Sequence, residues 1–248
     1  MALGDHLREL RKRLVISAVT ILIAAIAGFF VAEYVVDYLR IPINAIAEDR
    51  NATLTYLNVT GSFDLRLKIA FTIAIVASSP IWLYQIFAFL VPGLTKREKR
   101  YTFGFFFSAV PLFFAGAAFG WFLFPHMVQL LTSFSAPEDA ITLDALVYYD
   151  FVSKLVLAVG IAFVLPVFLV LLNFVGVLSG ESIIKSWRIA ILMITLFCAL
   201  ATPAADVVSM FLLAIPMVVL YLAAASIALI HDRRVAKRAA TLEASLAT

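Results

Sequence analysis

The sequence is poor in charge. Only 14% of its 248 residues are Asp, Glu, Lys or Arg, and 64% are hydrophobic, whereas about a quarter of an average soluble domain is charged. A soluble chain of this length could not bury so much apolar surface. The composition therefore excludes an ordinary soluble domain and indicates a protein whose solvent is the lipid bilayer.

Cysteine and histidine are also scarce. The single cysteine, Cys198, excludes an intrachain disulfide, and its place in an apolar run is typical of a small core residue. The three histidines, His6, His126 and His231, are far apart, and no pair has the spacing of metal ligands on a helix. The sequence has neither a Gly-x-Ser-x-Gly turn nor a glycine-rich phosphate loop. We therefore expect no catalytic residues, metal or cofactor, and a protein that is not an enzyme.

Long apolar runs predict six membrane-spanning helices in a single all-α transmembrane domain over residues 1–248. A spanning helix needs about 20 residues, and the last run is long enough for two. Pro203 and Asp206 lie within this run. Proline removes a backbone donor and a carboxylate is costly in hydrocarbon, so we expect these residues to divide the run into two spans. The predicted spans are 14–36, 67–91, 102–127, 152–177, 187–201 and 206–230.

The charges predict the orientation of these spans. Four segments together hold 14 Lys and Arg but 6 Asp and Glu, whereas the rest of the chain holds 5 and 10. These four segments are the N-terminus, the hinges at 92–101 and 177–188, and the C-terminal tail. An excess of Lys and Arg marks the cytoplasmic side of a membrane. Both termini are therefore expected in the cytoplasm, and the net charge of +3 reflects topology rather than nucleic-acid binding.

Four prolines, at positions 80, 111, 166 and 216, fall within the predicted spans. Membrane helices tolerate proline where neighbouring groups satisfy the freed backbone. Alternatively, the prolines bend their helices and shape a concave surface. We expect several kinked helices, and both interpretations stay open at the level of sequence.

Two carboxylates lie among the cytoplasmic bases. Glu9 is on an amphipathic N-terminal helix and has Arg13 four residues later, which is the spacing of an ordinary helical ion pair. Glu98 lies in a basic hinge and could simply neutralise its neighbours. A second interpretation is that both acids receive arginine side chains from a partner, because the planar guanidinium bonds a carboxylate with two parallel donors.

Several motifs resemble the TatC family, the multispanning subunit of the twin-arginine protein translocase. The opening HLRELRKR at 6–13 is similar to the family's H-L-x-E-L-R-x-R, and SPIWLYQIFAFLVPGL at 79–94, followed by Glu98, is similar to its most specific motif. SAPE at 135–138, Thr202-Pro203 with Asp206, and LAIPM at 213–217 extend the resemblance over nearly the whole chain.

The resemblance implies a concave cup of six helices in the plasma membrane and a core receptor subunit that binds the Arg-Arg signal peptide of folded proteins. In the family, the carboxylates at the positions of Glu9 and Glu98 form the docking patch. The residues that would surround this patch are Arg11, Gln85, Phe89 and Leu94. Positions with a structural or partner role would be Pro80, Pro92, Pro166, Asp206 and Pro216.

The resemblance also implies partners and a source of energy. TatA-like and TatB-like single-span subunits, membrane lipids and further copies of the chain would bind, and the proton motive force would drive transport. The family commonly has Glu where this chain has Val164 and Gln where it has Met210, so the partner site would rely on packing or on another polar residue such as Asn173 or Thr195.

The residues alone leave two other classes of protein to consider. In a small secondary transporter, Asp206 and the broken helices would line a substrate path. No inverted repeat is visible, and almost no charge lies in the middle of a span. A membrane enzyme would need clustered nucleophile, base or metal ligands, which the sequence does not offer.

Overall fold

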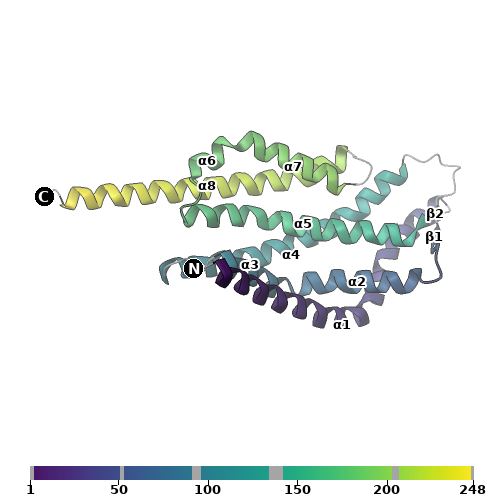
Figure 1. Ribbon diagram of the computed structural model, residues 1–248. Helices are drawn as coiled ribbons and strands as arrows, with labels where there is room; N and C mark the ends of the chain where they lie inside the picture. Colours follow the sequence, from purple (N-terminus) through teal and green to yellow (C-terminus); the bar gives the residue numbers. More distant parts are fainter. Residues whose placement is uncertain (1–2, 51–52, 91–95, 134–141, 203–206, 247–248) are drawn as a thin grey trace. The chain divides into compact units, whose positions relative to one another are not determined.

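The computed structural model describes five segments of the chain, residues 3–50, 53–90, 96–133, 142–202 and 207–246. Within them, side chains are not described at some positions, among them 44–50 and 96–103. The described helices are α1 (Leu3–Arg50), α2 (Gly61–Ala77), α3 (Ser79–Leu90), α4 (Lys96–Ser133), α5 (Ala145–Phe174), α6 (Gly180–Lys185), α7 (Trp187–Ala201) and α8 (Val207–Leu246) (Figure 1). Two short strands, β1 (Thr53–Thr55) and β2 (Thr142–Asp144), accompany them.

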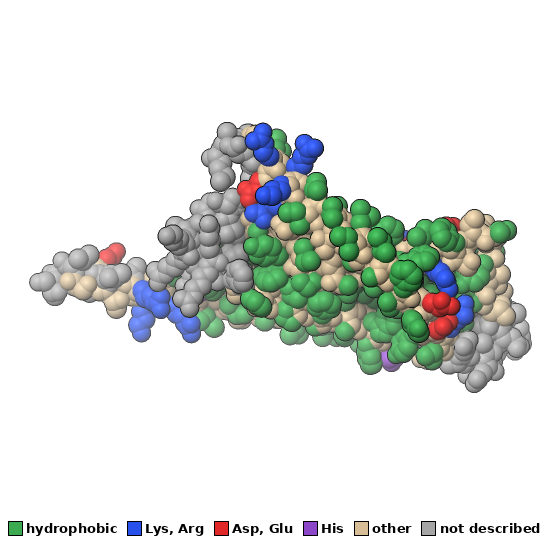
Figure 2. Space-filling model, turned by 90° about the horizontal axis from the view of Figure 1, so that it is seen from below, with side chains coloured by type: hydrophobic (Ala, Val, Ile, Leu, Met, Phe, Trp, Pro, Cys, Tyr) green, Lys and Arg blue, Asp and Glu red, His purple; other side chains and the backbone are tan. Residues whose placement is uncertain are grey.

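Four of these helices are long and apolar enough to cross a membrane: α1, α4, α5 and α8. The pair α2 and α3 passes the same test together, with a bend of 56° between them, whereas α7 is shorter. The described chain therefore has four spanning helices, or five with the bent pair, and the sixth span stays a prediction. On the face seen in Figure 2, hydrophobic side chains predominate and charged ones gather in a few groups, as expected for helices in a bilayer.

The helices pack as two compact units. The first unit comprises residues 1–92 and 110–161, and the second comprises 93–109 and 162–248. Each unit is described by itself below.

In the first unit, small residues bring α1 and α2 together, and the two helices lie side by side (Figure 1). Gly28 and Ala32 are buried one turn apart on α1, and Ala70 and Ala74 are buried one turn apart on α2. A Cβ atom placed on Gly28 would lie 2.7 Å from the carbonyl oxygen of Ala70. Small residues at this spacing let helix backbones approach closely where lipid provides no hydrophobic drive.

The break between α2 and α3 lies at Ser78, two residues before Pro80. Proline has no N–H and its ring crowds the carbonyl four residues earlier, so it is tolerated in the first turn of a helix and not in the interior. Pro80 is accordingly the second residue of α3. The indole N–H of Trp82 donates to the carbonyl of Ile75 at 2.8 Å, which satisfies one acceptor at the end of α2.

At the other end of α2, the two strands form a parallel pair that the sequence did not predict. Thr53, Leu54 and Thr55 lie opposite Thr142, Leu143 and Asp144. The strand β2 leads directly into α5, where the backbone N–H of Leu146 donates to Oδ1 of Asp144 at 2.9 Å and caps the helix. The strands are only three residues long, too short to show the alternation that reveals a strand in sequence.

Two buried tyrosines of α5 fasten this end of the unit to α1. The hydroxyl of Tyr148 donates to the carbonyl of Leu39 at 3.0 Å, and that of Tyr149 donates to the carbonyl of Val36 at 3.2 Å. A buried hydroxyl without a partner would be costly. The two hydrogen bonds therefore satisfy the tyrosines and fix the position of α5 against α1.

In the second unit, the short helix α6 packs against α8. The hydroxyl oxygen of Ser179 caps α6 by accepting the N–H of Ser182 at 3.1 Å, and the hydroxyl of Tyr221 donates to the carbonyl of Ile183. The carboxylate of Asp232 accepts the N–H of Gly180 at 2.6 Å. These contacts hold the connection between α5 and α7 on the surface of α8.

Candidate functional site

The first turns of α1 hold a carboxylate that already binds a guanidinium. Arg13 donates to Oε1 of Glu9 from Nη2 at 2.6 Å and from Nε at 3.1 Å. Its Nη1 also donates to Oε1 of Gln85 on α3 at 3.2 Å. The predicted ion pair between Glu9 and Arg13 is therefore confirmed, and it has a third member from a residue 72 positions away.

These residues line a surface cavity of about 480 Å³ in the first unit. Its walls come from α1 and α3, through Arg8, Glu9, Lys12, Arg13, Ile16 and Gln85. Among the described residues of this lining, three cations therefore accompany one carboxylate. The side chains of Arg13 and Glu9 are 22% and 27% exposed, so the pair is partly screened from water and strengthened relative to a fully exposed one.

The structure brings together some of the predicted docking residues and not others. Glu9 and Gln85 line the cavity, and Phe89 follows Gln85 by one turn on α3 and is partly buried. Arg11 lies on α1 but is exposed and is not part of the lining. Arg13 was missed as a site residue, although its place four residues after Glu9 marked it as a partner.

The remaining predicted positions are only partly visible. The backbone of Glu98 belongs to α4, but its side chain is outside the described part of the chain. Leu94, Pro92 and Asp206 lie outside the described residues altogether. Whether Glu98 approaches Glu9 thus stays a prediction.

The two other predicted prolines lie inside continuous helices. Pro166 is buried in α5, and Pro216 is partly buried in α8. Their helices continue past them, so the kinks expected at these positions stay predictions. Pro111 is likewise inside α4.

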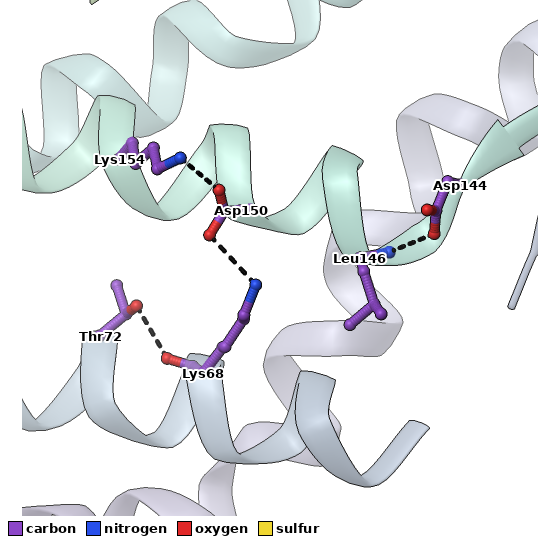
Figure 3. Close-up of polar contacts among 6 residues, drawn as sticks. All are labelled: Lys68, Thr72, Asp144, Leu146, Asp150 and Lys154. Atoms are coloured by element: carbon purple, nitrogen blue, oxygen red, sulfur yellow. Dashed lines mark hydrogen bonds and ion pairs between the residues drawn. The ribbon is translucent and has the colours of Figure 1, made fainter. Parts of the chain in front are cut away.

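A second polar cluster, missed at the level of sequence, lies between α2 and α5 of the first unit (Figure 3). Oδ1 of Asp150 on α5 accepts a hydrogen bond from Nζ of Lys68 on α2 at 3.3 Å. Asp150 also forms an ion pair with Lys154, one turn later on its own helix. The lysines are 50% and 76% exposed. In the sequence, Asp150 and Lys154 lie four residues apart in an otherwise apolar run, and this spacing could have indicated the cluster.

A largely apolar cavity of about 430 Å³ lies within the second unit, between α5, α6, α7 and α8. Leu165 and Pro166 line it from α5, whereas the neighbouring Val164 is buried at 2% exposure and does not. Met210 is partly buried on α8. The position where the resemblance implies a carboxylate is therefore occupied by a buried valine.

Asn173 and Thr195, the polar residues considered as substitutes for this carboxylate, donate hydrogen bonds within the chain. The amide of Asn173 donates to the carbonyl of Leu178 and to Oδ1 of Asp232, both at 2.9 Å. The hydroxyl of Thr195 donates to the carbonyl of Ile191 on its own helix at 2.8 Å. Both donors are therefore satisfied within the chain, and the basis of a partner contact stays a prediction.

Comparisons with known proteins agree with the motifs. The profile of the family "Sec-independent protein translocase protein (TatC)" matches residues 5–216. The TatC protein of Xylanimonas cellulosilytica is 38% identical over 97% of this chain and 88% of its own length. That of Rothia mucilaginosa is 37% identical over the whole chain and 87% of its own length.

Solved structures give the same result. A crystal structure described as the twin-arginine translocase receptor TatC has a TM-score of 0.76 and 32% sequence identity, over 90% of this chain and 97% of that chain. A second structure of the receptor in the detergent DDM has a TM-score of 0.79 at the same identity, over 90% and 99%. This chain therefore belongs to the TatC family of Sec-independent protein translocase proteins and is a multi-pass membrane protein of the twin-arginine translocase.

Proposed function

We propose that this chain is the receptor that binds twin-arginine signal peptides in the cavity around Glu9. The observation that carries the proposal is the contact between Glu9 and Arg13, because this cavity already holds a guanidinium with short, charge-assisted hydrogen bonds. The related crystal structures are described as twin-arginine translocase receptors, which supports the same role here.

Glu98 supplies the second carboxylate in this proposal. It begins the helix α4 together with four neighbouring bases, and a carboxylate in the first turn of a helix is stabilised by the helix dipole. Each of the two arginines of a signal peptide would then find one acid. Phe89 and Leu94 would contact the apolar residues that follow the arginine pair, and Arg11 would lie at the rim.

In the proposed topology, the chain crosses the plasma (inner) membrane six times, and both termini lie in the cytoplasm. The bent pair α2 and α3 forms one span, and α7 forms a short one, since its 15 residues reach only about 22 Å at 1.5 Å per residue. Local thinning of the bilayer accommodates such a helix. The gathering of Lys and Arg at one set of helix ends supports this orientation.

Transport itself requires partners in this proposal. The chain forms a single transmembrane domain, and copies of it self-associate. TatA-like and TatB-like single-span subunits assemble on its outer helices, and membrane lipids surround the complex. The chain has no catalytic role, and the membrane potential drives transport, at about 2.3 kcal/mol per charge per 100 mV. Family membership argues against the alternative of a small-solute transporter.

Binding of a fluorescent twin-arginine signal peptide to the purified protein in lipid nanodiscs tests the receptor role. We expect Glu9→Ala and Glu98→Ala each to weaken binding, and a Lys-Lys peptide to bind less tightly than the Arg-Arg peptide. The matched control is Glu181→Ala, because Glu181 also forms an ion pair with i,i+4 spacing, with Lys185 at 2.7 Å, but lies on α6 in the second unit. Equal binding by all variants and both peptides would refute the proposal.

A further inference from the structure

The helix α8 carries a group of four bases shortly after Ile230, the last residue of its apolar run. The helix continues without a break to Leu246 (Figure 1). The bases are all exposed, and they are Arg233, Arg234, Lys237 and Arg238. None of them forms an ion pair with a residue that the structure describes. Their charge is therefore available to a group outside the described chain.

The four bases lie on one side of α8. At 3.6 residues per turn, successive residues are about 100° apart, so positions 233, 234, 237 and 238 fall within an arc of about 140°. We call this side the basic face. Asp232 and Glu243, the two acids between 231 and 246, lie about 150–170° from the middle of the arc. A topology signal requires bases at one end of a span but not on one side of the helix, so it does not account for this segregation.

The contacts of Asp232 show where the basic face points. Its carboxylate accepts the N–H of Gly180 on α6 at 2.6 Å and the amide of Asn173 on α5 at 2.9 Å. Both of these residues therefore lie on the acidic side of α8, within the second unit. The basic face is on the opposite side and points away from them. The charge of Asp232 is directed inward and does not neutralise the four bases.

The basic face lies at the depth of lipid headgroups. At 1.5 Å per residue, Arg233 is about 4.5 Å and Arg238 about 12 Å beyond Ile230 along the helix. The headgroup layer on each side of the hydrocarbon core is about 5–7 Å thick, and the Debye length at physiological ionic strength is about 8 Å. All four charges are thus within, or less than one Debye length from, the layer that contains the lipid phosphates.

From this placement we propose that the basic face of α8 binds the phosphate headgroups of anionic phospholipids in the adjoining leaflet. Clusters of four to eight Lys and Arg directly after a spanning helix, on its cytoplasmic side, attract such lipids. Lipid is favoured over an acidic protein segment because the span itself places the basic face beside the phosphates. The inference specifies the headgroup of the membrane lipids around the chain. It rests on the proposed topology and not on peptide binding at Glu9.

Energy transfer in nanodiscs measures which lipids gather at the basic face. The full chain carries a donor fluorophore at Ala240→Cys, an exposed position on α8, whereas the native Cys198 is buried and does not react. The nanodiscs contain phosphatidylcholine and a small fraction of either phosphatidylglycerol or phosphatidylcholine with an acceptor on its acyl chain, so that the headgroup is intact. We expect phosphatidylglycerol to be enriched near the donor about fivefold or more, the factor that one base near the surface provides, and the enrichment to fall at high salt.

Three variants test whether the bases cause this enrichment. Replacement of all four bases by Gln should abolish it, whereas replacement of the three arginines by Lys should preserve it, because attraction to the headgroup layer depends on charge. The matched control is Lys185→Gln. Lys185 is also an exposed base of the second unit, but it already pairs with Glu181 at 2.7 Å, so its removal should leave the enrichment unchanged.

The outcomes separate this inference from the receptor function. Equal energy transfer to both lipids in the wild type would overturn the inference, and an acidic protein segment would become the better ligand for the basic face. Enrichment that survives the four Gln substitutions, or that Lys185→Gln removes equally well, would also overturn it. Both leaflets of the nanodisc have the same composition, so the result does not depend on the orientation of the chain. Peptide binding at Glu9 is measured separately, and either proposal can fail alone.

Discussion

Replacement of Gly28 by alanine tests how α1 is held. Gly28 is buried against the backbone of Ala70, and an added Cβ would lie 2.7 Å from the carbonyl oxygen there. Ordinary van der Waals contact begins near 3.4 Å, so the two helices would have to separate by about 0.7 Å, the difference between these distances. A compensating change at Ala70 cannot relieve this contact, because it involves the backbone and not the side chain.

Overpacking of this kind costs about 1–3 kcal/mol, whereas alanine is favoured over glycine in a helix interior by up to about 1 kcal/mol. Gly104 lies in the interior of α4 with nothing within 4 Å of its added Cβ, so Gly104→Ala measures the helix preference without the clash. The difference between the two variants isolates the packing cost. At roughly 2–4 °C per kcal/mol for a chain of this size, Gly28→Ala should melt about 2–12 °C below Gly104→Ala.

Thermal unfolding in detergent, followed by tryptophan fluorescence, measures this difference. Size-exclusion chromatography of each variant before heating confirms that both start from the same folded monodisperse state. Equal melting temperatures would contradict the reasoning, since they would mean that the backbones of α1 and α2 are not in close contact at Gly28. Val at position 28 should lower the melting temperature further, because its larger side chain meets the same backbone.

Three smaller perturbations test polar contacts between helices. Asp232→Asn replaces the carboxylate that accepts the N–H of Gly180. It should lower the free energy of unfolding by about 1 kcal/mol, a value reduced for the partial exposure of the contact. Glu243→Gln on the same helix is the control, and an equal melting temperature for the two variants would refute the role of this hydrogen bond. Tyr149→Phe removes a buried hydroxyl that donates to the carbonyl of Val36 and should lower the free energy of unfolding by about 1 kcal/mol. Tyr34 is 77% exposed, so Tyr34→Phe should leave the stability unchanged. A larger loss for Tyr34→Phe than for Tyr149→Phe would contradict the hydrogen bond. Asp150→Asn leaves two lysines without their shared carboxylate. It should lower the free energy of unfolding by up to about 1 kcal/mol at low salt, which is more than Lys154→Gln should. A double-mutant cycle of Asp150→Asn and Lys68→Gln that gives no coupling energy would rule out the ion pair between Asp150 and Lys68.

The sequence predicted the helices well because apolar composition and length are local properties. The expected span at 187–201 coincides with α7 (Trp187–Ala201), and the expected start of the last span at 206 lies one residue from the start of α8. The helix α1 extends beyond the expected span 14–36 in both directions, so the ends of that span stay a prediction. A hydropathy window detects where a helix is apolar and not where it ends, and polar residues continue a helix without interruption.

Contacts between distant residues were beyond the sequence. The spacing of Glu9 and Arg13 predicted their ion pair, but nothing in it pointed to Gln85 as the third member. The same holds for Asp150, where the partner on its own helix could be read from the spacing and Lys68 could not. Tertiary packing decides which helix faces which, and a single sequence contains periodicity but no record of such pairs.

The charge of the Glu9 cavity also constrains how a signal peptide would bind under the proposed function. Among the described side chains of its lining, three cations accompany one carboxylate, so under the proposed function we do not expect long-range electrostatic attraction to provide the affinity for a cationic peptide. Short-range hydrogen bonds at Glu9 select the arginines but return little net free energy, because Glu9 is 27% exposed and bonds from the peptide replace bonds from water. Most of the affinity must therefore come from the apolar segment of the signal peptide, through burial at about 25 cal/mol per Å². A peptide with both arginines but without its apolar segment should bind far more weakly than one with a full apolar segment, while the preference for arginine over lysine persists in both.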